Sequence, residues 1–343
     1  MPVRSFTDTS AVSIAYALGD GLTPADFSGE SFKLLPYTSE GFQMQKEART
    51  STAITTSRRT SGSKNTRGTA NGSVGLEFGA APFILDMLSL ALMSEWADLN
   101  PVVPATGKFI TDSDLKKFMA VEKTTKGGPS ATDKLYHERY YGTAVNDMSI
   151  EFGDAELVTM SLNTISVFAD YASAVAGADG LGGSLATAKV VPAPYEIADS
   201  SNNLKSVVLR DGSGTPMEVV FSDASLQVQN NVREQTGLGA EFASGVGVGK
   251  VAVTLSGEIY FYDQTVLKAH MDNQRLSAEL SVETAQGTFT VYLPNLMAQA
   301  PTNNAGGENQ DYKTQITFAA EAGQVDLGNG PLDCVIAVKY VAK

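Results

Sequence analysis

The stretch LQVQNNVRE, residues 226–234, has a counterpart in FQMQKEART, residues 42–50. Gln, Gln and Arg recur at the same three places, 184 positions apart. The residues between them alternate apolar and polar in the same phase, and such a period of two is typical of a half-buried β-strand. The chain therefore carries one strand-like phrase twice.

The segments that follow the two phrases also repeat. A strand pattern that ends at Phe78 leads into AAPFILDMLSLALMSEW. Apolar residues at i, i+1, i+4 and i+5 from Phe83 predict a helix there, with Pro82 in its first turn. In the second half the same spacing recurs from Phe261 to Val266, at an offset of 183. Two anchors that agree within one residue predict an internal duplication.

The second half contains a long strand followed by a short helix. Alternation over residues 251–261 predicts the strand, in which Gly257 marks a bulge or a close backbone approach. Asp263 stands at the position expected for an N-cap of the helix. The apolar stripe of this helix is predicted to be Val266, Leu267, His270 and Met271.

A β-hairpin is predicted after this helix. Residues 277–283 and 288–293 each alternate with a period of two, and the segment TAQG turns between them. Pro294 cannot donate a backbone hydrogen bond, so it is expected to end the second strand or to lie at an edge.

Length and composition set the fold class. The 343 residues are 43% hydrophobic, and the 32 Gly, 12 Tyr and 15 Phe favour strands joined by turns. We expect an all-β fold with one short helix per half, formed by two tandem domains of sandwich or barrel type. The first covers residues 1–195 and the second 204–343. The join lies near VVPAPYEIADSSNN, residues 190–203, where prolines and polar residues interrupt the pattern.

A basic segment contrasts with an acidic chain. The net charge of −13 argues against a protein whose main task is gripping nucleic acid, because phosphates are neutralised by clustered cations. Residues 48–76 nevertheless contain five cations and no acidic residue, and they are predicted to form a long exposed loop in which TANG is a turn. The cations of this basic loop, residues 49–68, are Arg49, Arg58, Arg59, Lys64 and Arg67.

Three interpretations of the basic loop stay open: a nucleic-acid contact, a solvated loop, and a contact with the acidic surface of another copy of the chain. The third is favoured, because the rest of the chain is strongly acidic and complementary patches would set the register between subunits.

Residue types that carry catalysis are sparse. His137, His270 and Cys334 are the only histidines and the only cysteine, and no local motif marks a nucleophile or a metal-ligand spacing. The Gly-rich stretch SGVGVGKV, residues 244–251, has Ser and Val where a phosphate-binding loop needs Gly and Ser or Thr. The chain is therefore predicted to be no enzyme and to hold no cofactor or metal. Cys334 is interpreted as a small buried apolar residue.

No targeting or membrane segment is expected. The start MPVRSFTDTSAV is interrupted by polar residues before an apolar region forms, and the window FILDMLSLALM is too short to span a bilayer. A single Cys fits folding in a reducing compartment.

Several of these stretches resemble a known family. The runs FKLLPYTSEGFQMQKEART and GSVGLEFGAAPFILDMLSLALMSEW are similar to the N-terminal part of tail tube (major tail) proteins of bacteriophages with long, non-contractile tails. YYGTAVNDMSIEFGDAELVTMSLNTIS resembles their next strand pair. LQVQNNVRE, VTLSGEIYFYDQTVL and FTVYLPNLMAQAPTNNAGGENQDYKTQITFAAE resemble their C-terminal part. The resemblance covers most of the chain and rests on the order of strand and turn phrases.

This resemblance implies a structural virion protein. Its subunits would form closed rings that stack into a hollow tube, assembled in the host cytoplasm, around a tape-measure protein and later around viral DNA during ejection. Tail terminator and distal tail or baseplate proteins would be further partners. A duplicated chain suits a homotrimeric ring with pseudo-sixfold symmetry, and a homohexamer is the alternative. A receptor-binding or decoration β-module of the particle is the alternative function.

Overall fold

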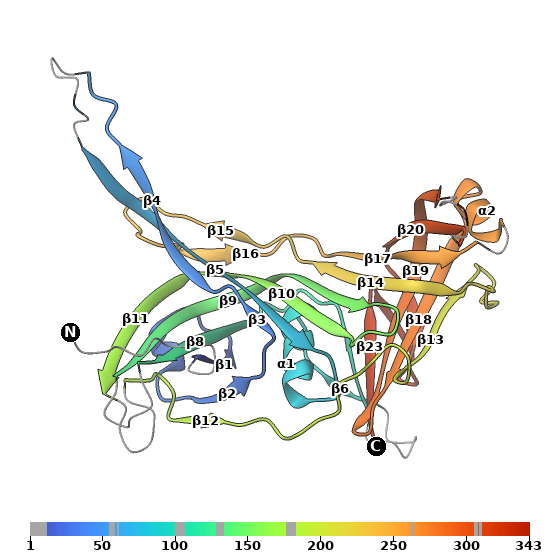
Figure 1. Ribbon diagram of the computed structural model, residues 1–343, viewed down its shortest axis with the longest axis horizontal. Helices are drawn as coiled ribbons and strands as arrows, with labels where there is room; N and C mark the ends of the chain where they lie inside the picture. Colours follow the sequence, from blue (N-terminus) through green and yellow to red (C-terminus); the bar gives the residue numbers. More distant parts are fainter. Residues whose placement is uncertain are drawn as a thin grey trace.

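The computed structural model describes residues 12–54, 59, 62–99, 107–127, 134–175, 183–261, 264–304, 308 and 311–343. The described part of the chain is built mainly of β-strands, with two short α-helices and one 3-10 helix (Figure 1). The all-β fold with a short helix in each half is therefore confirmed. Nineteen of the described strands belong to one branched, hydrogen-bonded system that does not close into a barrel.

The first half contains the following elements: β1 (Val12–Gly19), η2 (Pro24–Phe27), β2 (Ser31–Leu35), β3 (Ser39–Glu40), β4 (Gln43–Thr50), β5 (Ser63–Glu77), α1 (Pro82–Ala91), β6 (Ala97–Asp98), β7 (Gly107–Thr111), β8 (Phe118–Lys126), β9 (Lys134–Phe152), β10 (Thr159–Ser166), β11 (Phe168–Val175) and β12 (Ala188–Val190).

The second half contains β13 (Leu204–Arg210), β14 (Phe221–Gln229), β15 (Arg233–Gln235), β16 (Gly245–Gly247), β17 (Ala252–Tyr260), α2 (Thr265–Met271), β18 (Arg275–Glu283), β19 (Gly287–Asn304), β20 (Lys313–Ala320), β21 (Gly323–Asp326), β22 (Pro331–Cys334) and β23 (Ala337–Ala342).

The two halves use one order of strand pairing. In the first half β1 pairs with β8, β8 with β9, β9 with β10 and β11, β10 with β5, and β5 with β4. In the second half β13 pairs with β18, β18 with β19, β19 with β20 and β23, β20 with β17, and β17 with β14. All of these pairings are antiparallel, and in both halves the helix follows the strand that the repeated phrase pairs with.

The repeated phrases form hairpins of equal register. Gln43 lies opposite Asn71 in the first hairpin, and Gln227 lies opposite Thr254 in the second. The first members of these pairs differ by 184 positions and the second by 183, which are the two offsets seen in the sequence. The register also slips by one residue at the same place, after Lys46 in the first hairpin and between β14 and β15 in the second.

The halves are joined by strand pairing and by a common core. The edge of β14 that faces away from β17 pairs with β9, from Ala224 opposite Phe152 to Gln229 opposite Asp147. Strand β23 of the second half pairs with β7 of the first. One cluster of buried apolar side chains draws on both halves, and the rings of Phe78 and Phe289 lie 5.2 Å apart within it. Because the two halves share strand pairs and a core, the proposed division into two domains between residues 195 and 204 rests on the sequence repeat alone.

The helices follow the predicted apolar stripes in part. In α1 the predicted residues Phe83 and Met87 are buried, and Pro82 occupies the first turn as expected. In α2 Val266 is buried together with Ala269, whereas Met271 is 76% exposed, so the predicted stripe was wrong at its end. The predicted N-cap Asp263 lies outside the described residues.

Two further details correct or support the sequence reading. The hairpin of β18 and β19 is confirmed, but β19 does not end at Pro294 and continues to Asn304. The ladder slips by one residue beside Pro294, and such a bulge tolerates a residue without an N–H group. The interruption at Gly257 is a close backbone approach, because a Cβ atom there would collide with the carbonyl oxygen of Asp223.

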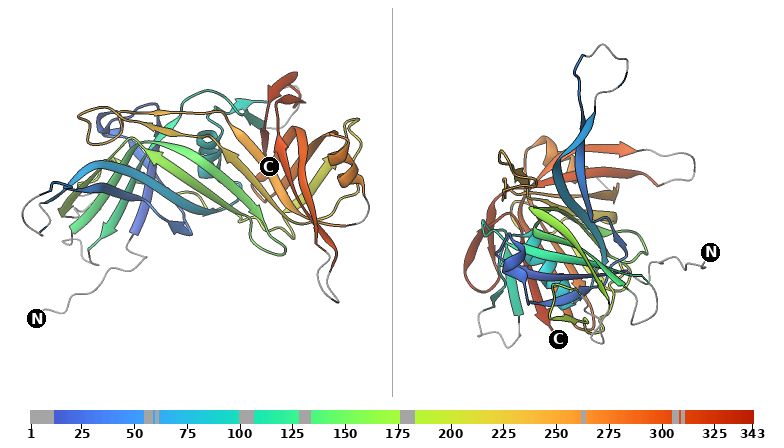
Figure 2. Two further views of the ribbon diagram at one scale, coloured as in Figure 1. Left: turned by 90° about the horizontal axis from the view of Figure 1, so that it is seen from above. Right: turned by 90° about the vertical axis from the view of Figure 1, so that its left-hand side faces the viewer.

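The predicted basic loop is largely a hairpin. Strands β4 and β5 pair as far as Thr50 opposite Ser63, so only residues 51–62 connect them. The segment TANG, expected to be a turn, lies inside β5. Thr and Ser are compatible with strands, and cross-strand pairing satisfies their backbone groups even where no core covers them. The hairpin projects from the body in two perpendicular views (Figures 1 and 2).

Candidate functional site

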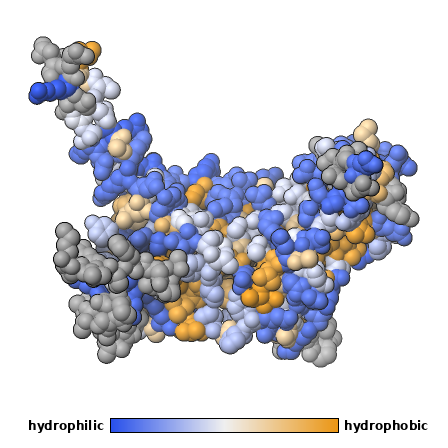
Figure 3. Space-filling model, in the orientation of Figure 1, coloured by the Kyte–Doolittle hydropathy of each residue, from blue (hydrophilic) through white to orange (hydrophobic). Residues whose placement is uncertain are grey.

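The projecting hairpin is the most distinctive surface feature of the chain. We call its outer part, residues 46–50 and 63–67, the arm. Every described residue of the arm except Arg67 is exposed, and the surface there is largely hydrophilic (Figure 3). An isolated two-stranded hairpin is marginally stable in water, because it has no third strand or core face to support it. The arm is therefore a surface that would gain order from a partner.

The described members of the predicted contact set have different surroundings. Arg49 on β4 forms an ion pair with Glu47 of the same strand, with an N–O distance of 2.7 Å. Lys64 lies opposite Arg49, on the exposed part of β5. Arg59 is exposed in the connection between the strands, whereas Arg58 lies outside the described residues. Arg67 forms an ion pair with Glu234 of the second hairpin, within the same chain.

The base of the arm is tied to the loop of the second hairpin. Lys46 forms an ion pair with Glu241, and the backbone N–H of Gly68 donates to the carbonyl oxygen of Glu241 at 2.7 Å. The ring of Phe242 covers Gly68, where a side chain would collide with it. Sequence reasoning missed Glu234 and Glu241, because their partners stand more than 150 positions away and no local spacing marks them.

The second hairpin lies across the first half of the chain, as Figure 1 shows for β15 and β16. Asn230, at the register slip, donates through its side-chain amide to the carbonyl oxygens of Ala91 and Val145, at 2.8 and 3.0 Å. The backbone N–H of Asn230 donates to the carbonyl of Asn146 at 2.8 Å. Val232 is buried in an apolar cluster that includes residues of the first half. The second hairpin is therefore held against the first half of its own chain by hydrogen bonds and apolar packing.

A buried charge cluster fastens the segment that connects the halves. The Glu122 carboxylate on β8 is fully buried and contacts Arg139 at 3.3 Å and Lys189 at 3.0 Å. It also accepts a hydrogen bond from the backbone N–H of Leu185 at 2.8 Å. Burial by itself would raise the pKa of Glu122, but the Leu185 N–H and the Lys189 ammonium outweigh it, so the pKa is lowered. The cluster thus holds β12 and the residues before it against β8 and β9.

The candidate nucleophile residues occupy structural positions on separate elements. His137 is buried on β9, with Nδ1 3.0 Å from the Thr124 hydroxyl. Nδ1 of His270 lies 2.8 Å from the carbonyl oxygen of Ala298, which fastens α2 to β19. Cys334 is buried at the end of β22, as predicted, and burial raises its thiol pKa to about 12, so it is a poor nucleophile.

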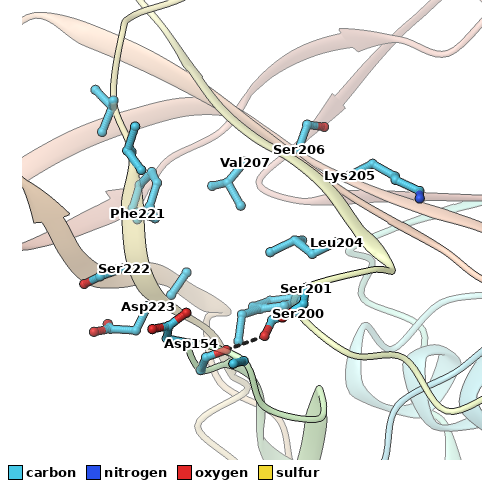
Figure 4. Close-up of a pocket in the computed structure, with 16 residues that line it drawn as sticks. Asp154, Ser200, Ser201, Leu204, Lys205, Ser206, Val207, Phe221, Ser222 and Asp223 are labelled. Carbon is cyan, nitrogen blue, oxygen red and sulfur yellow. Dashed lines mark hydrogen bonds between the residues drawn. The ribbon is translucent and has the colours of Figure 1, made fainter.

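A cavity lies where the two halves meet. It has a volume of about 350 Å³ and lies between the β9–β10 turn, β13 and β14. Asp154, Lys205 and Asp223 are its charged lining residues, and in Figure 4 Lys205 lies across the opening from the two carboxylates. No histidine or cysteine belongs to its described lining. The cavity therefore lies at the boundary between packed strands, and its described lining does not group residues in a catalytic arrangement.

The described residues show neither a metal-binding group of side chains nor a membrane-spanning helix. Within the described ranges, no three His, Cys, Asp or Glu side chains are grouped so that they could hold a metal ion. No helix in this part of the chain has the length and apolar character needed to cross a bilayer.

These features define a β-rich protein with a hairpin that projects from its body. A family model for phage tail tube proteins matches residues 7–320, and the chain belongs to this family. The match confirms the resemblance to phage tail tube proteins and makes the protein a structural component of the virion tail. No curated protein matches the chain.

Proposed function

We propose that three copies of this chain form a closed ring with pseudo-sixfold symmetry. Rings stack into the hollow tube of a long, non-contractile tail, through which viral DNA passes during infection. The observation that carries this proposal is the equal pairing order of the two halves, with hairpins whose registers match at offsets of 184 and 183. Two like units per chain would supply six like positions around a ring of three chains.

Strand edges give the physical reason for ring closure. Exposed edges of long strands promote uncontrolled association unless another strand covers them, and a closed ring of subunits covers each edge once. A contact between two different surfaces of a subunit gives a closed ring when the rotation between neighbours is a whole fraction of 360°. Contacts between the two faces of successive rings do not close, so they extend the rings into a filament. A tube of stacked rings satisfies both conditions.

The acidic balance suits a conduit for DNA. A chain with a net charge of −13 repels phosphates on average, so DNA would slide past it without being held. Membership of a structural family favours a non-enzymatic role. The tape-measure protein, tail terminator and distal tail proteins are the partners that such a tube would require.

The basic residues of the hairpin are proposed to contact acidic surface on the next ring. Arg59 and Lys64 support this role because they are exposed on the projecting part of the hairpin. Arg67 lies nearer its base and forms an ion pair with Glu234 of the same chain. Reversal of Arg58 and Arg59 to Glu should weaken ring stacking and leave the fold intact. Tube assembly that is unchanged at several salt concentrations would contradict this contact.

Electron microscopy of the purified protein and of virions tests the main proposal. We expect tubes of uniform width, with three chains in each ring. Six chains per ring would remove the trimer, and a location only at a spike or in the head would remove the tube function itself.

A further inference from the structure

The dipeptide Asn-Gly occurs twice in the chain, at residues 71–72 and 329–330. In such a pair the backbone nitrogen of the Gly can attack the side-chain carbonyl carbon of the Asn, because the Gly has no side chain that obstructs the attack. A five-membered imide forms and ammonia leaves. Water then opens the imide to aspartate or to isoaspartate. The backbone must bend for this reaction, so the fold decides which pair reacts.

The first pair is held extended inside a sheet. Asn71 of β5 lies opposite Gln43 of β4 on one side and opposite Ile165 of β10 on the other. The ring of Phe42 packs directly against Gly72, where even a Cβ atom would collide with it. This backbone can bend only if strand pairing on both sides of β5 is first broken.

The second pair lies in an exposed turn. The ladder of β21 and β22 ends at Asp326 opposite Pro331, so residues 327–330 connect the two strands outside the ladder. Asn329 is exposed. Gly330 has a φ of 92°, which Gly adopts without strain. A turn of this kind can change its backbone angles without breaking a strand pair.

A carboxylate lies beside the nitrogen that would attack. Oδ1 of Asp326 accepts hydrogen bonds from the backbone N–H groups of Gly328 and Gly330, at 2.8 and 3.2 Å. The longer distance is within the reach that a general base needs. As the Gly330 nitrogen bonds to the side-chain carbon of Asn329, its proton can pass to Asp326. The proton then returns to the departing amide nitrogen, which leaves as ammonia.

We propose that Asn329 is a site of spontaneous deamidation, with Asp326 as the base, and that its strands protect Asn71 from the same reaction. Water is the only other reactant. A virion protein is not renewed after the particle has formed, so the modification would accumulate with the age of the particle.

The modification would remove a contact between the two halves. The side-chain amide of Asn329 donates a hydrogen bond to the carbonyl oxygen of Asp98 on β6, at 3.1 Å. Both residues are exposed, so water can replace this bond and the amide can leave it to react. An ionised carboxylate has no hydrogen to donate, so the product would repel the Asp98 carbonyl oxygen. The turn between β21 and β22 would then loosen from the first half.

Loosening of the turn should be visible at Cys334. Strands β21 and β22 form a separate two-stranded sheet, and an isolated hairpin is only marginally stable. Leu327 in the turn and Cys334 at the end of β22 belong to the same small buried cluster. A turn that is detached from β6 would uncover this cluster, so a maleimide should label the only cysteine of the chain faster.

Peptide mapping by mass spectrometry tests the site. The purified chain is kept warm at mildly alkaline pH and sampled over weeks. We expect a gain of one dalton and isoaspartate at Asn329. Asn71 should react at least about tenfold more slowly, because β5 must first open locally. In the urea-unfolded chain the two sites should react at similar rates. Equal rates in the folded chain, or no product at Asn329, would overturn the proposal.

The substitution Asp326→Asn tests the base. It keeps an oxygen that can accept the two hydrogen bonds of the turn but cannot take up the proton. The reaction at Asn329 should slow by up to about 100-fold, the smaller end of what a positioned base supplies in enzymes. The urea-unfolded variant and the urea-unfolded wild-type chain should react at the same rate. An unchanged rate in the folded variant would exclude Asp326 as the base.

Two substitutions at Asn329 test the loosening of the turn. Asn329→Asp carries the charge of the product from the start and should raise the labelling rate of Cys334 roughly fivefold, the effect of one lost hydrogen bond. The matched control Asn329→Gln keeps an amide, but its imide ring would need one more atom. It should form no product in the same period and label as slowly as the fresh wild-type chain. If Asn329→Asp labels no faster than that chain, deamidation does not loosen the turn.

Discussion

The two hairpins of this chain have the same register and opposite surroundings. The second is seated on the first half, with Asn230 bonded to buried carbonyls and Val232 buried. The first projects into solvent, and its outer strands are exposed. Within its own chain the first hairpin is bound near its base, by Lys46, Arg67 and Gly68, which agrees with the proposed contact of its outer part with another copy.

The largest expected effect on the stability of the subunit lies at Glu122, whose charge cluster holds β12 against β8 and β9. Glu122→Gln leaves Arg139 and Lys189 without their buried counter-charge, and loss of one partner of such a cluster costs about 3–5 kcal/mol. Urea unfolding of the isolated subunit measures the loss. Glu95→Gln, which changes an exposed carboxylate, should cost under about 0.5 kcal/mol.

The same cluster gives a pH dependence. Because the folded state lowers the pKa of Glu122, its stabilisation is fully present above the ordinary value of 4.5 and is lost as the pH falls through the lowered pKa. The wild-type chain should therefore lose more stability than Glu122→Gln upon acidification below pH 4.5. Parallel pH profiles of the two proteins would exclude this role.

A matched pair of substitutions tests the contacts that hold the second hairpin against the first half. Asn230→Ala leaves the buried carbonyls of Ala91 and Val145 unsatisfied and should cost about 2–4 kcal/mol. Lys46→Ala, at the equivalent position of the first hairpin, removes only an exposed ion pair and should cost under about 1 kcal/mol in the isolated subunit. Equal losses in chemical denaturation would show that the two hairpins are not differently supported.

Assembly should reduce the difference between the hairpins. Backbone amides of the arm are expected to exchange roughly tenfold or more slowly in tubes than in free subunits, which corresponds to about 1.4 kcal/mol of local stabilisation. The amides of β15 and β16 should change little, because their seat is already present in the single chain. Hydrogen exchange followed by mass spectrometry reports both, and an arm that stays unprotected in tubes would contradict the proposed contact.

The smallest effect is expected at the tie between the hairpins. Arg67 and Glu234 form a partly exposed ion pair, so a double-mutant cycle with Arg67→Ala and Glu234→Ala should give a coupling of about 0.2–1 kcal/mol. The coupling should decrease as salt is raised, since the pair is accessible to ions. A coupling that does not change with salt would contradict the exposure of this pair to solvent.

Local patterns in the sequence predicted much of the secondary structure. Alternation gave the strands around residues 251–261 and 277–293, and the apolar stripe gave α1. The errors lie where tertiary pairing overrides local preference: β19 passes Pro294 through a bulge, TANG lies within a strand, and the basic loop is mostly a hairpin. Cross-strand hydrogen bonds satisfy these backbones, and such bonds are not visible in a local window.

The candidate site could be predicted less well than the fold. Composition marked the cations of the basic segment, but it did not indicate that Arg67 pairs with Glu234 or that Lys46 pairs with Glu241. The edge of β14 that pairs with β9 carries no residue signature at all. Every strand has an edge, and only the sheet order decides which edges are covered.

The sequence by itself determined that this is an all-β chain with a repeated strand phrase, because alternation and spacing are properties of neighbouring residues. The tertiary structure decided which of the two phrases finds its partner inside the chain. Pairing between β14 and β9 joins residues more than 70 positions apart, and the enclosure of Glu122 and Asn230 depends on several elements at once. Such contacts follow from the packing of whole sheets, so the exposed hairpin appears only when the chain is folded.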